Sequence, residues 1–476
     1  MTIDTNSSLH PAIDTPEVHG AIDQIIDGIR KAQEAIDGVR PPLPEREAEA
    51  KSLIETFGEA RGRGLVFPLM GSGLGRGALV ELTDGSVKYD FITGIGVNAF
   101  GHGDLDIIRT TLMAATGDVV MQGNLQCNRD AVDFSETLLD AAAGNGDRVL
   151  KHCFLTNSGA LANENALKIC MQKTCGAPRV LTFEHCFAGR TTTMAQIGDS
   201  AGGRMGIPLN LEVEYLPFFD PADPDGSTQA AILQIEEAIR RYPHQHCCLV
   251  MEPVQGEGGF NLAPREFFEP LMKRAKEAGI PVWFDEVQSF GRTESMFRYQ
   301  ELGVQPDVVS IGKMSQACAT LFTAEMNPRP GLLSATFIGS TASFKVGRRM
   351  LERLQSEGAY GKDGRNARLH TVFREAAAEL VNANPQHFPS LKDHSRPAHP
   401  DEVIGGAGCM MRLSPYGGDA KRIKSLLNRM FDAGVIAFYC GHGPFHLRFL
   451  PPLGVLQESD IREVIRIVSE SLEETE

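Results

Sequence analysis

The chain of 476 residues lacks several features that mark membrane and secreted proteins. No run approaches the roughly 18 apolar residues that a membrane-spanning helix needs. The N-terminal region, with Asp4, His10 and Glu17, contains no apolar core of a signal peptide. The ten cysteines include no CxxC pair, and the adjacent Cys247 and Cys248 lie in an apolar run typical of a buried strand. We therefore expect a cytoplasmic protein with reduced thiols and no membrane partner.

The chain also lacks an excess of positive charge. Lysine and arginine total 46 against 61 aspartates and glutamates, which gives a formal net charge of -15. Such a surface repels polyanions, so nucleic acid is not an expected partner. Small anions can still bind, because surface charges farther away than a Debye length of roughly 8 to 10 Å are screened and local amides or arginines then dominate.

Internal repeats and low-complexity tracts are absent, and 42% hydrophobic with 22% charged residues indicate a globular protein of two or three domains. Isoleucines at helical spacing predict a helix over residues 21–39, ahead of a break at Pro41–Pro44. Strand-like runs at 78–83 and 86–92 flank Asp84-Gly85, which predicts a hairpin with a two-residue turn. We expect residues 1–104 to form an N-terminal segment that packs with a small C-terminal domain.

Residues 105–345 alternate short apolar runs with helical stretches, which is typical of a mainly parallel sheet covered by helices. The predicted strands lie at 153–155, 179–183, 247–251, 281–284 and 308–311. Residues 346–476 predict a smaller α+β domain. The expected fold class is α/β, and ligands of such sheets bind beyond the carboxyl ends of the strands.

Two of these strand ends carry residues suited to an anion and to a flat ligand. Ser158, Gly159 and Ala160 follow the first strand and begin a helix, where free backbone N–H groups bind anions. A plain N-cap by Ser158 is the alternative. Phe187 and Arg190 follow the second strand and would suit a planar ligand and a carboxylate. Taken alone, these two side chains also fit an ordinary core position and an ordinary surface position.

The other strand ends carry ionisable residues. Glu252 and Glu257 lie in a glycine-rich loop after 247–251. Asp285 follows an apolar strand and needs a partner, which a protonated ring nitrogen would provide, because an unpaired buried carboxylate is destabilising or takes up a proton. Lys313 follows 308–311, where desolvation would lower its pKa toward that of a nucleophilic amine, although a surface lysine is the alternative. Together the five strand ends predict a pocket for a phosphorylated pyridine aldehyde.

Four motifs occur in one order along the chain, namely EPVQGEGG (252–259), FDEVQ (284–288) with GRT (291–293), PDVVSIGK (306–313) and RFLPPL (448–453). With them, the chain from about Gly71 to Leu453 resembles the class III aminotransferases, which are fold-type-I pyridoxal-phosphate enzymes. The resemblance implies a large cofactor-binding domain and a smaller α+β domain.

The resemblance also implies roles for the residues at the strand ends. Lys313 would form a Schiff base with pyridoxal 5'-phosphate and shuttle the proton, and Asp285 would keep the pyridine nitrogen protonated. Backbone amides of Gly159 and Ala160, beside Ser158, would bind the phosphate.

Three further side chains would hold the cofactor ring. Phe187 would stack on one ring face, and Val287 would press on the other. Gln288 would reach the ring hydroxyl. No metal ion belongs to this set.

The resemblance further implies how substrates and a second subunit contribute. Arg190 is similar to the arginine that binds the α-carboxylate of glutamate or 2-oxoglutarate. Glu257 and Arg448 resemble a gate pair, in which the glutamate covers the arginine for one substrate and releases it for the other. Thr336 resembles a threonine that crosses to the phosphate of the neighbouring subunit, with Thr341 as the competing position, so a homodimer with a shared active site is implied.

Some positions depart from the common family pattern. Leu161 stands where many members have glutamate, Ala188 replaces histidine or tryptophan, and GKMSQAC lacks the usual glycines after the lysine. GALANENALK and GKMSQAC are more similar to the lysine ε-aminotransferase and 4-aminobutyrate aminotransferase branch, and Ile95 replaces the tyrosine of ornithine-specific members. We expect a ping-pong transfer of an ω-amino group to 2-oxoglutarate. The open alternatives are an acetylornithine, ornithine or diamine aminotransferase, pyruvate as acceptor, an aminomutase, decarboxylase or racemase, and a cofactor-binding regulator without turnover.

Two other patterns carry less weight. The glycine-rich stretch Gly71–Gly77 resembles a dinucleotide-binding loop, but it precedes a predicted hairpin instead of the helix that such a loop requires. His244, His246, Cys247 and Cys248 suggest a metal site, yet adjacent residues of a strand point to opposite faces. We expect neither a dinucleotide nor a metal.

Overall fold

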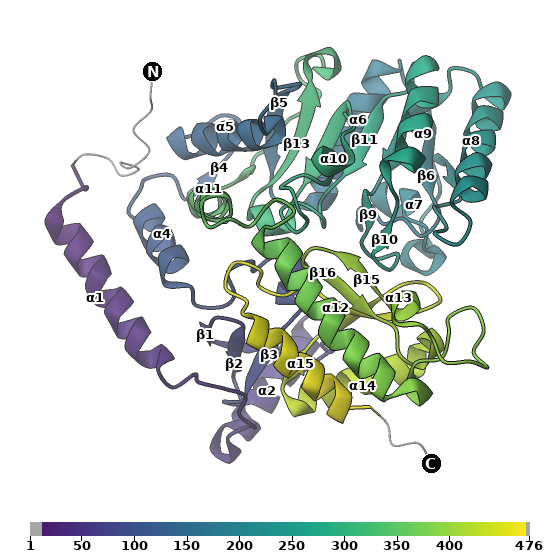
Figure 1. Ribbon diagram of the computed structural model, residues 1–476. Coiled ribbons are helices and arrows are strands. Elements are labelled where there is room, and N and C mark those ends of the chain that lie inside the picture. Colours follow the sequence, from purple (N-terminus) through teal and green to yellow (C-terminus); the bar gives the residue numbers. More distant parts are fainter. Residues whose placement is uncertain (1–11, 473–476) are drawn as a thin grey trace.

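The main sheet of the computed structural model, which describes residues 12–472, has seven strands (Figure 1). The first residues, with Asp4 and His10, lie outside the described part. In spatial order the strands are β5 (Leu150–Thr156), β13 (Cys318–Thr323), β12 (Val308–Ile311), β11 (Val282–Asp285), β8 (His246–Met251), β6 (Arg179–Phe183) and β7 (Glu212–Leu216). Pairing is parallel from β12 to β7, while β13 is antiparallel to both of its neighbours. The predicted α/β class with a mainly parallel sheet is confirmed.

Helices cover this sheet on both faces because successive strand residues point to opposite sides. On β11, Val282 and Phe284 belong to a core cluster with residues of α5 (Arg129–Ala143), α8 (Pro224–Arg241) and α9 (Arg265–Glu277). Trp283, between them, belongs to a second cluster with residues of α6 (Gly159–Lys173). Both faces of β11 are therefore apolar, and its one ionisable residue, Asp285, lies at its carboxyl end.

The N-terminal and C-terminal parts of the described chain meet in a second sheet. Strands β1 (Gly71–Arg76), β2 (Leu79–Leu82), β3 (Val87–Asp90) and β17 (Val435–Ile436) form it, and β3 pairs with β17 in parallel. A third sheet contains β15 (Ile404–Ala407), β16 (Met410–Leu413), β19 (His446–Phe449) and β18 (Phe438–Cys440). In Figure 1 this region lies below the main sheet, with α12 (Arg365–Ala383), α14 (Ala420–Ala433) and α15 (Glu458–Glu470) around it. The division at residues 104 and 345 stays a prediction.

The described chain contains further strand pairs and α-helices. The strand pairs are β4 (Met121–Gln122) with β14 (Gly339–Ser340), and β9 (Val254–Gln255) with β10 (Asn261–Leu262). The remaining helices are α1 (Pro16–Gln33), α2 (Pro44–Ala60), α3 (Thr93–Gly96), α4 (Leu105–Ala115), α7 (Met194–Ile197), α10 (Arg298–Leu302), α11 (Thr341–Ser356) and α13 (Pro400–Val403). Between residues 12 and 472 no helix is both long and apolar enough to cross a membrane. The cytoplasmic location stays a prediction.

The first helix differs from the prediction of 21–39. It begins at Pro16, because Thr15 caps it by accepting a hydrogen bond from the backbone N–H of Val18. It ends at Gln33, whose side-chain amide donates to the carbonyl oxygens of Gly75 and Gly103 at 2.7 and 2.6 Å. Long-range contacts of Gln33 therefore accompany the end of the helix before the predicted boundary.

The hairpin between β2 and β3 is confirmed, but its turn has three residues instead of two. Leu82 N–H donates to the carbonyl of Ser86, which leaves Thr83, Asp84 and Gly85 as the turn. Gly85 adopts a left-handed φ of 79°, the conformation that closes a three-residue loop.

Two strands of the main sheet were not predicted. β7 has the alternating sequence EVEYL of a half-exposed edge strand, and β13 begins only five residues after Lys313. A search for wholly apolar runs does not find the first, and the parallel pattern does not anticipate the second.

Candidate active site

The carboxyl ends of the parallel strands converge on one cavity of about 210 Å³. Its walls come from the helix after β5, the loops after β6 and β8, the end of β11 and the residues after β12. The lining residues are Gly159, Ala160, Asn163, Phe187, Ala188, Gly189, Glu252, Asp285, Val287, Gln288 and Lys313. Seven of the predicted site residues thus lie around one space.

The N-terminus of α6 forms one wall of this cavity. Ser158 accepts a hydrogen bond from Leu161 N–H at 3.2 Å, so it is an N-cap whatever else it does. A Cβ at Gly159 would lie 2.6 Å from a methyl carbon of Val287, and one at Gly312 would lie 2.9 Å from the sulfur of Cys318. Glycine at both positions lets the helix N-terminus and the lysine-bearing segment approach the end of β11.

Asp285 lies at the cavity as the last residue of β11. Its carboxylate accepts hydrogen bonds from Asn163 Nδ2 at 2.7 Å and from Val287 N–H at 2.9 Å. Burial raises the pKa of Asp285 to about 6, although these hydrogen bonds and the charge of Lys313 oppose that shift. The buried carboxylate is therefore fixed in orientation, and a cationic group of a ligand beside it would favour its ionised form.

Asn163 is a cavity residue that the sequence analysis missed. Its amide nitrogen also donates to the carbonyl of Ala188 at 2.7 Å, so it links the loop after β6 to Asp285. The available signal was helical periodicity, because Asn163 follows Gly159 by four residues and is a buried polar residue on an otherwise apolar helix face. Gly189, another missed residue, packs so closely that a Cβ there would lie 2.8 Å from that of Ala160.

Lys313 follows Gly312, which is the first residue after β12. Its φ of 53° is left-handed, which is unusual for a residue with a side chain and recurs at functional sites. Burial lowers the pKa of Lys313, while the negative charges of Asp285 and Glu257 oppose the shift. A lowered pKa makes its amine a better nucleophile and proton carrier at neutral pH.

Gln288, Phe187 and Glu252 complete the walls. The side-chain oxygen of Gln288 is buried and has no hydrogen-bond partner within residues 12–472. Glu252 accepts hydrogen bonds from the backbone N–H groups of Phe187 and Gly256 at 2.8 and 2.9 Å, which fixes the loop that carries the Phe187 ring. Burial raises the pKa of Glu252 to about 8. The loops after β6 and β8 are therefore tied to each other at the cavity.

Glu257 and Arg448 form an ion pair beside the cavity, although they are 191 residues apart. Arg448 Nη1 donates to Glu257 Oε1 at 2.5 Å, and Gln288 Nε2 lies 3.4 Å from the same oxygen. Burial opposes ionisation of Glu257, but the charge and hydrogen bond of Arg448 outweigh it and keep the pKa of Glu257 low. Arg448 is fully buried, and its Nε and Nη2 have no hydrogen-bond partner in the described chain.

Arg190 stands apart from the residues that line the cavity. Its guanidinium carbon lies 4.9 Å from the centroid of the Phe187 ring, and its side chain is exposed. It therefore lies next to one wall of the cavity instead of inside it.

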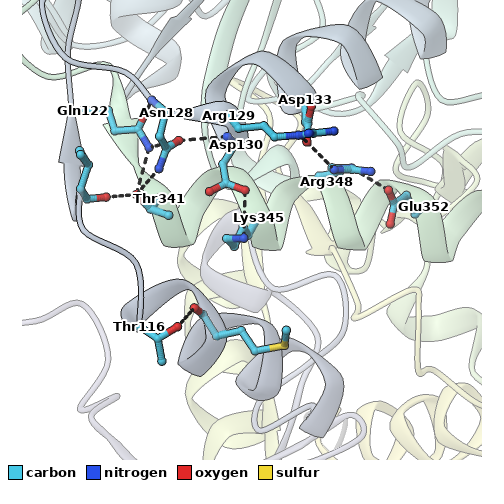
Figure 2. A network of polar contacts seen from close by, with 12 residues as sticks. Thr116, Gln122, Asn128, Arg129, Asp130, Asp133, Thr341, Lys345, Arg348 and Glu352 are labelled. Carbon is cyan, nitrogen blue, oxygen red and sulfur yellow. Dashed lines mark hydrogen bonds and ion pairs between the residues drawn. The ribbon is translucent and has the colours of Figure 1, made fainter. Parts of the chain in front are cut away.

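The two candidate threonines have different surroundings. Thr341 is buried, and its hydroxyl contacts Gln122, Asn128 and the backbone carbonyl of Val119 within the same chain (Figure 2). Thr336 is exposed in the segment before β14 and does not line the cavity. A phosphate ligand from a neighbouring subunit requires a free hydroxyl, which the exposed position offers and the buried one does not.

These residues fit pyridoxal 5'-phosphate. The unpartnered oxygen of Gln288 matches a ring hydroxyl donor, and the buried Asp285 matches a protonated ring nitrogen. The helix N-terminus at Gly159 and Ala160 matches the phosphate, and Lys313 supplies the amine for the aldehyde.

Comparison with known proteins identifies the family. A family model for class-III aminotransferases matches residues 72–472. The diaminobutyrate–2-oxoglutarate transaminase of Wolinella succinogenes is 25% identical over 407 residues, covering 84% of this chain and 90% of that protein. Acetylornithine aminotransferase 2 of Bordetella pertussis is 35% identical over 246 residues, covering 50% and 57%. The lysine aminotransferase of M. tuberculosis superposes with a TM-score of 0.75 at 23% identity, covering 88% of this chain and 99% of that one.

The family model spans most of the chain and ends at the last described residue. Its range includes all five strand ends that form the cavity and Arg448 on β19. The chain therefore belongs to the class-III aminotransferases, enzymes that use pyridoxal 5'-phosphate to act on amino-acid and oxo-acid substrates.

Proposed function

We propose that this enzyme moves an ω-amino group, from a donor of the lysine or 4-aminobutyrate type, to 2-oxoglutarate in a ping-pong cycle. The observation that carries the proposal is the ion pair between Glu257 and the fully buried Arg448 beside the cavity. A paired arginine presents no charge to a substrate that reacts through a terminal amine. Once unpaired, it binds the carboxylate of an α-oxo acid, so one pocket serves two dissimilar substrates.

When bound, pyridoxal phosphate supplies the electron sink that stabilises a carbanion next to the reacting nitrogen. Asp285 keeps a proton on the ring nitrogen through its buried carboxylate, and Asn163 holds that carboxylate in place. Lys313 Nζ would carry the proton between the amine-bearing carbon of the substrate and the aldehyde carbon of the cofactor. Its lowered pKa allows it to release and recover a proton near neutral pH.

The remaining proposed residues bind and orient. Backbone N–H groups of Gly159 and Ala160 hold the phosphate, with Ser158 beside them. Phe187 and Val287 hold the two faces of the ring between them. This arrangement would hold the ring in one orientation in the cavity.

Gln288 and Arg190 complete the set. The oxygen of Gln288 accepts the hydrogen bond of the ring hydroxyl. Arg190 binds a substrate carboxylate next to the Phe187 wall. The walls and the mouth of the cavity therefore have separate tasks, cofactor binding and substrate binding.

The names of similar proteins support this substrate class. The matched proteins include a diaminobutyrate–2-oxoglutarate transaminase, acetylornithine aminotransferases and a lysine aminotransferase. We infer transfer from a terminal amine because each of these named amino compounds has an amine away from the α-carbon.

We also propose that the enzyme is a homodimer in which Thr336 reaches the phosphate of the other subunit. Apolar side chains are exposed around the β4–β14 pair, with Leu125 fully exposed and Phe337 52% exposed. Val120 and Met121 belong to the same patch. A second copy of the chain would remove these side chains from water and bring Thr336 to a neighbouring cavity.

A half-reaction screen tests the proposal. The cofactor-loaded protein is mixed with 4-aminobutyrate, lysine, diamines and α-amino acids, and loss of the cofactor's visible absorbance band is followed. We expect the ω-amino donors to react fastest and 2-oxoglutarate to restore the band with stoichiometric formation of glutamate. Turnover without any oxo acid would instead indicate an aminomutase, decarboxylase or racemase. A band that no amine shifts would indicate a binding protein without turnover.

The gate is tested by Glu257→Gln. Loss of the carboxylate leaves Arg448 uncovered in both half-reactions, so we expect the preference for ω-amino donors over α-amino acids to fall about tenfold. The ratio of half-reaction rate constants measures this preference. Glu266→Gln, an exposed residue in the first turn of α9, is the matched control and should leave the ratio unchanged. An unchanged ratio in Glu257→Gln would contradict the gate.

A further inference from the structure

Two histidine rings stack on each other beside the gate loop. The rings of His185 and His442 have centroids 5.5 Å apart and planes inclined by 15°. His185 lies in the loop after β6, two residues before Phe187, and His442 lies between β18 and β19. Both side chains are exposed, so no apolar core requires them to stack.

The loops that carry these histidines pack on the loop of Glu257. A Cβ at Gly258 would lie 2.6 Å from the carbonyl oxygen of His185, so glycine there permits close packing of the two loops. Gly441 N–H, next to His442, donates to the carbonyl of Glu257 at 2.8 Å. The ring pair is therefore positioned by the same backbone that holds the gate carboxylate.

The polar groups of these side chains make no hydrogen bond or ion pair with the rest of the described chain. The ring nitrogens of His185 and His442 and the guanidinium of Arg190 have no hydrogen bond or ion pair within residues 12–472. Arg190 is nevertheless held in place, because it lies over the Phe187 ring and against Gly203, where a Cβ would lie 2.4 Å from Nη1. Donors without a partner next to the Phe187 wall of the cavity are suited to an anionic ligand.

The surroundings of His442 lower its pKa. Partial burial is the largest cause, and His185 and Arg190 lower the pKa further, whereas Asp199 and Glu257 oppose the shift. His185 donates its own backbone N–H to Asp199 at 2.9 Å, which places that carboxylate beside the pair. An arriving anion adds negative charge and favours the protonated, doubly donating form of the ring.

We propose that His185 and His442, together with Arg190, form a site for a substrate carboxylate at the mouth of the cavity. The site selects dicarboxylic oxo acids and amino acids whose carboxylate lies several atoms from the reacting amine. The inference deepens the proposed function, since it names which substrate group these side chains receive. It adds two residues from loops far apart in sequence to the one arginine implied by the resemblance.

Equilibrium binding of glutarate to the cofactor-loaded protein tests the site without turnover. Glutarate has two carboxylates but neither an amine nor a carbonyl, and glutaramide is its uncharged analogue of equal length. We expect calorimetry to show tighter binding of glutarate than of glutaramide. We expect His185→Gln and His442→Gln each to raise the dissociation constant for glutarate about tenfold, as for loss of a charged hydrogen bond. His244→Gln, an exposed histidine at the opposite end of β8, is the matched control and should change nothing.

The pH dependence of the unmodified enzyme gives a second measurement that needs no variant. Glutarate should bind more tightly at about pH 6 than at about pH 8, because an anion favours the protonated ring of His442, and His442→Gln should reduce that difference. Unchanged glutarate affinity in both histidine variants, or equal weakening of glutarate and glutaramide, would overturn the proposal. Failure of the proposed transamination would show instead as an absent amine reaction, while glutarate binding would still report on this site.

Discussion

At the cavity, Asp285 and Lys313 have pKa values that differ from those of the same groups in bulk water. Burial raises the pKa of Asp285 to about 6 and lowers that of Lys313, while the opposite charge of each moderates the shift of the other. Both groups are therefore adjusted toward neutral pH, where a proton carrier works best. The same burial that suits the reaction destabilises the folded chain without its cofactor.

Asp285→Asn measures that destabilisation. The pKa of Asp285 lies at about 6 in the folded chain against a usual 3.8, so the folded state binds more protons between these values. Its contribution to stability is therefore present at low pH and lost as the pH rises through about 6. As the pH rises from about 4 to about 7, we expect the unfolding free energy of the variant to increase relative to that of the unmodified cofactor-free chain. The expected relative increase is on the order of 1 to 3 kcal/mol. Urea unfolding of both proteins at the two pH values checks this. The same difference in unfolding free energy between variant and unmodified chain at both pH values would contradict it.

Asn163 acts on the reaction through Asp285 and is therefore a positioning residue. Asn163→Ala removes one hydrogen bond to the carboxylate, so we expect the pKa of Asp285 to rise further and kcat to fall about tenfold or more. Asn165→Ala, two residues along the same helix, is the control and should keep kcat within about twofold. A pH profile of kcat with the same apparent pKa values in Asn163→Ala and in the unmodified enzyme would argue against this role.

At the scale of elements, glycines set how closely the α6 N-terminus, the end of β11 and the segment after β12 approach one another. The helix begins where the chain leaves β5, and its N-cap is satisfied by Ser158. A side chain at Gly159 would collide with Val287, which is itself proposed to press on the ring. The proposed phosphate site and the proposed ring site are therefore in direct contact.

Gly159→Ala should therefore weaken cofactor binding more than it lowers the free energy of unfolding. We expect the dissociation constant for pyridoxal phosphate to rise about tenfold or more, because Val287 and the helix terminus must move apart. Gly28→Ala in α1, where an added Cβ meets nothing within 4 Å, is the matched control and should leave cofactor affinity unchanged. Fluorescence titration of the cofactor-free protein compares the two variants.

At the scale of the whole molecule, residues distant in sequence join the parts of the chain. Arg292 is buried and donates to the carbonyl of Pro451 at 3.1 Å, and a Cβ at Gly96 would lie 2.9 Å from its Nε. Burial lowers the pKa of this arginine to about 10. It therefore connects the loop after β11 with the N-terminal and C-terminal parts of the described chain.

The two threonines before and at the start of α11 give a prediction at this scale. Thr341→Ala removes contacts with Gln122 and Asn128 inside one chain (Figure 2), so we expect it to lower the unfolding free energy by about 1 to 3 kcal/mol. Thr336→Ala should leave stability unchanged but weaken cofactor binding about tenfold if it contacts the phosphate of the other subunit. Thermal unfolding and cofactor titration on both variants separate the roles. Unaltered cofactor affinity in Thr336→Ala would contradict the shared site.

Local sequence was sufficient for much of the fold. The strands that hold Asp285 and Lys313, the helix that begins at Gly159 and the hairpin from β2 to β3 follow from short apolar runs and turn residues. The exact end of α1, the three-residue turn and strands β7 and β13 do not, because contacts from other elements or an edge position decide them.

The sequence by itself determined that the ends of the parallel strands carry a helix N-terminus, an aspartate and a lysine, since strand direction places these ends at one edge of a sheet. Only the tertiary structure decided which distant groups meet there. The pairing of Glu257 with Arg448, the bond from Asn163 to Asp285 and the stacking of two histidines each depend on where separate loops are brought together. Such contacts have no local signal, because the energy that fixes them comes from the packing of the whole chain.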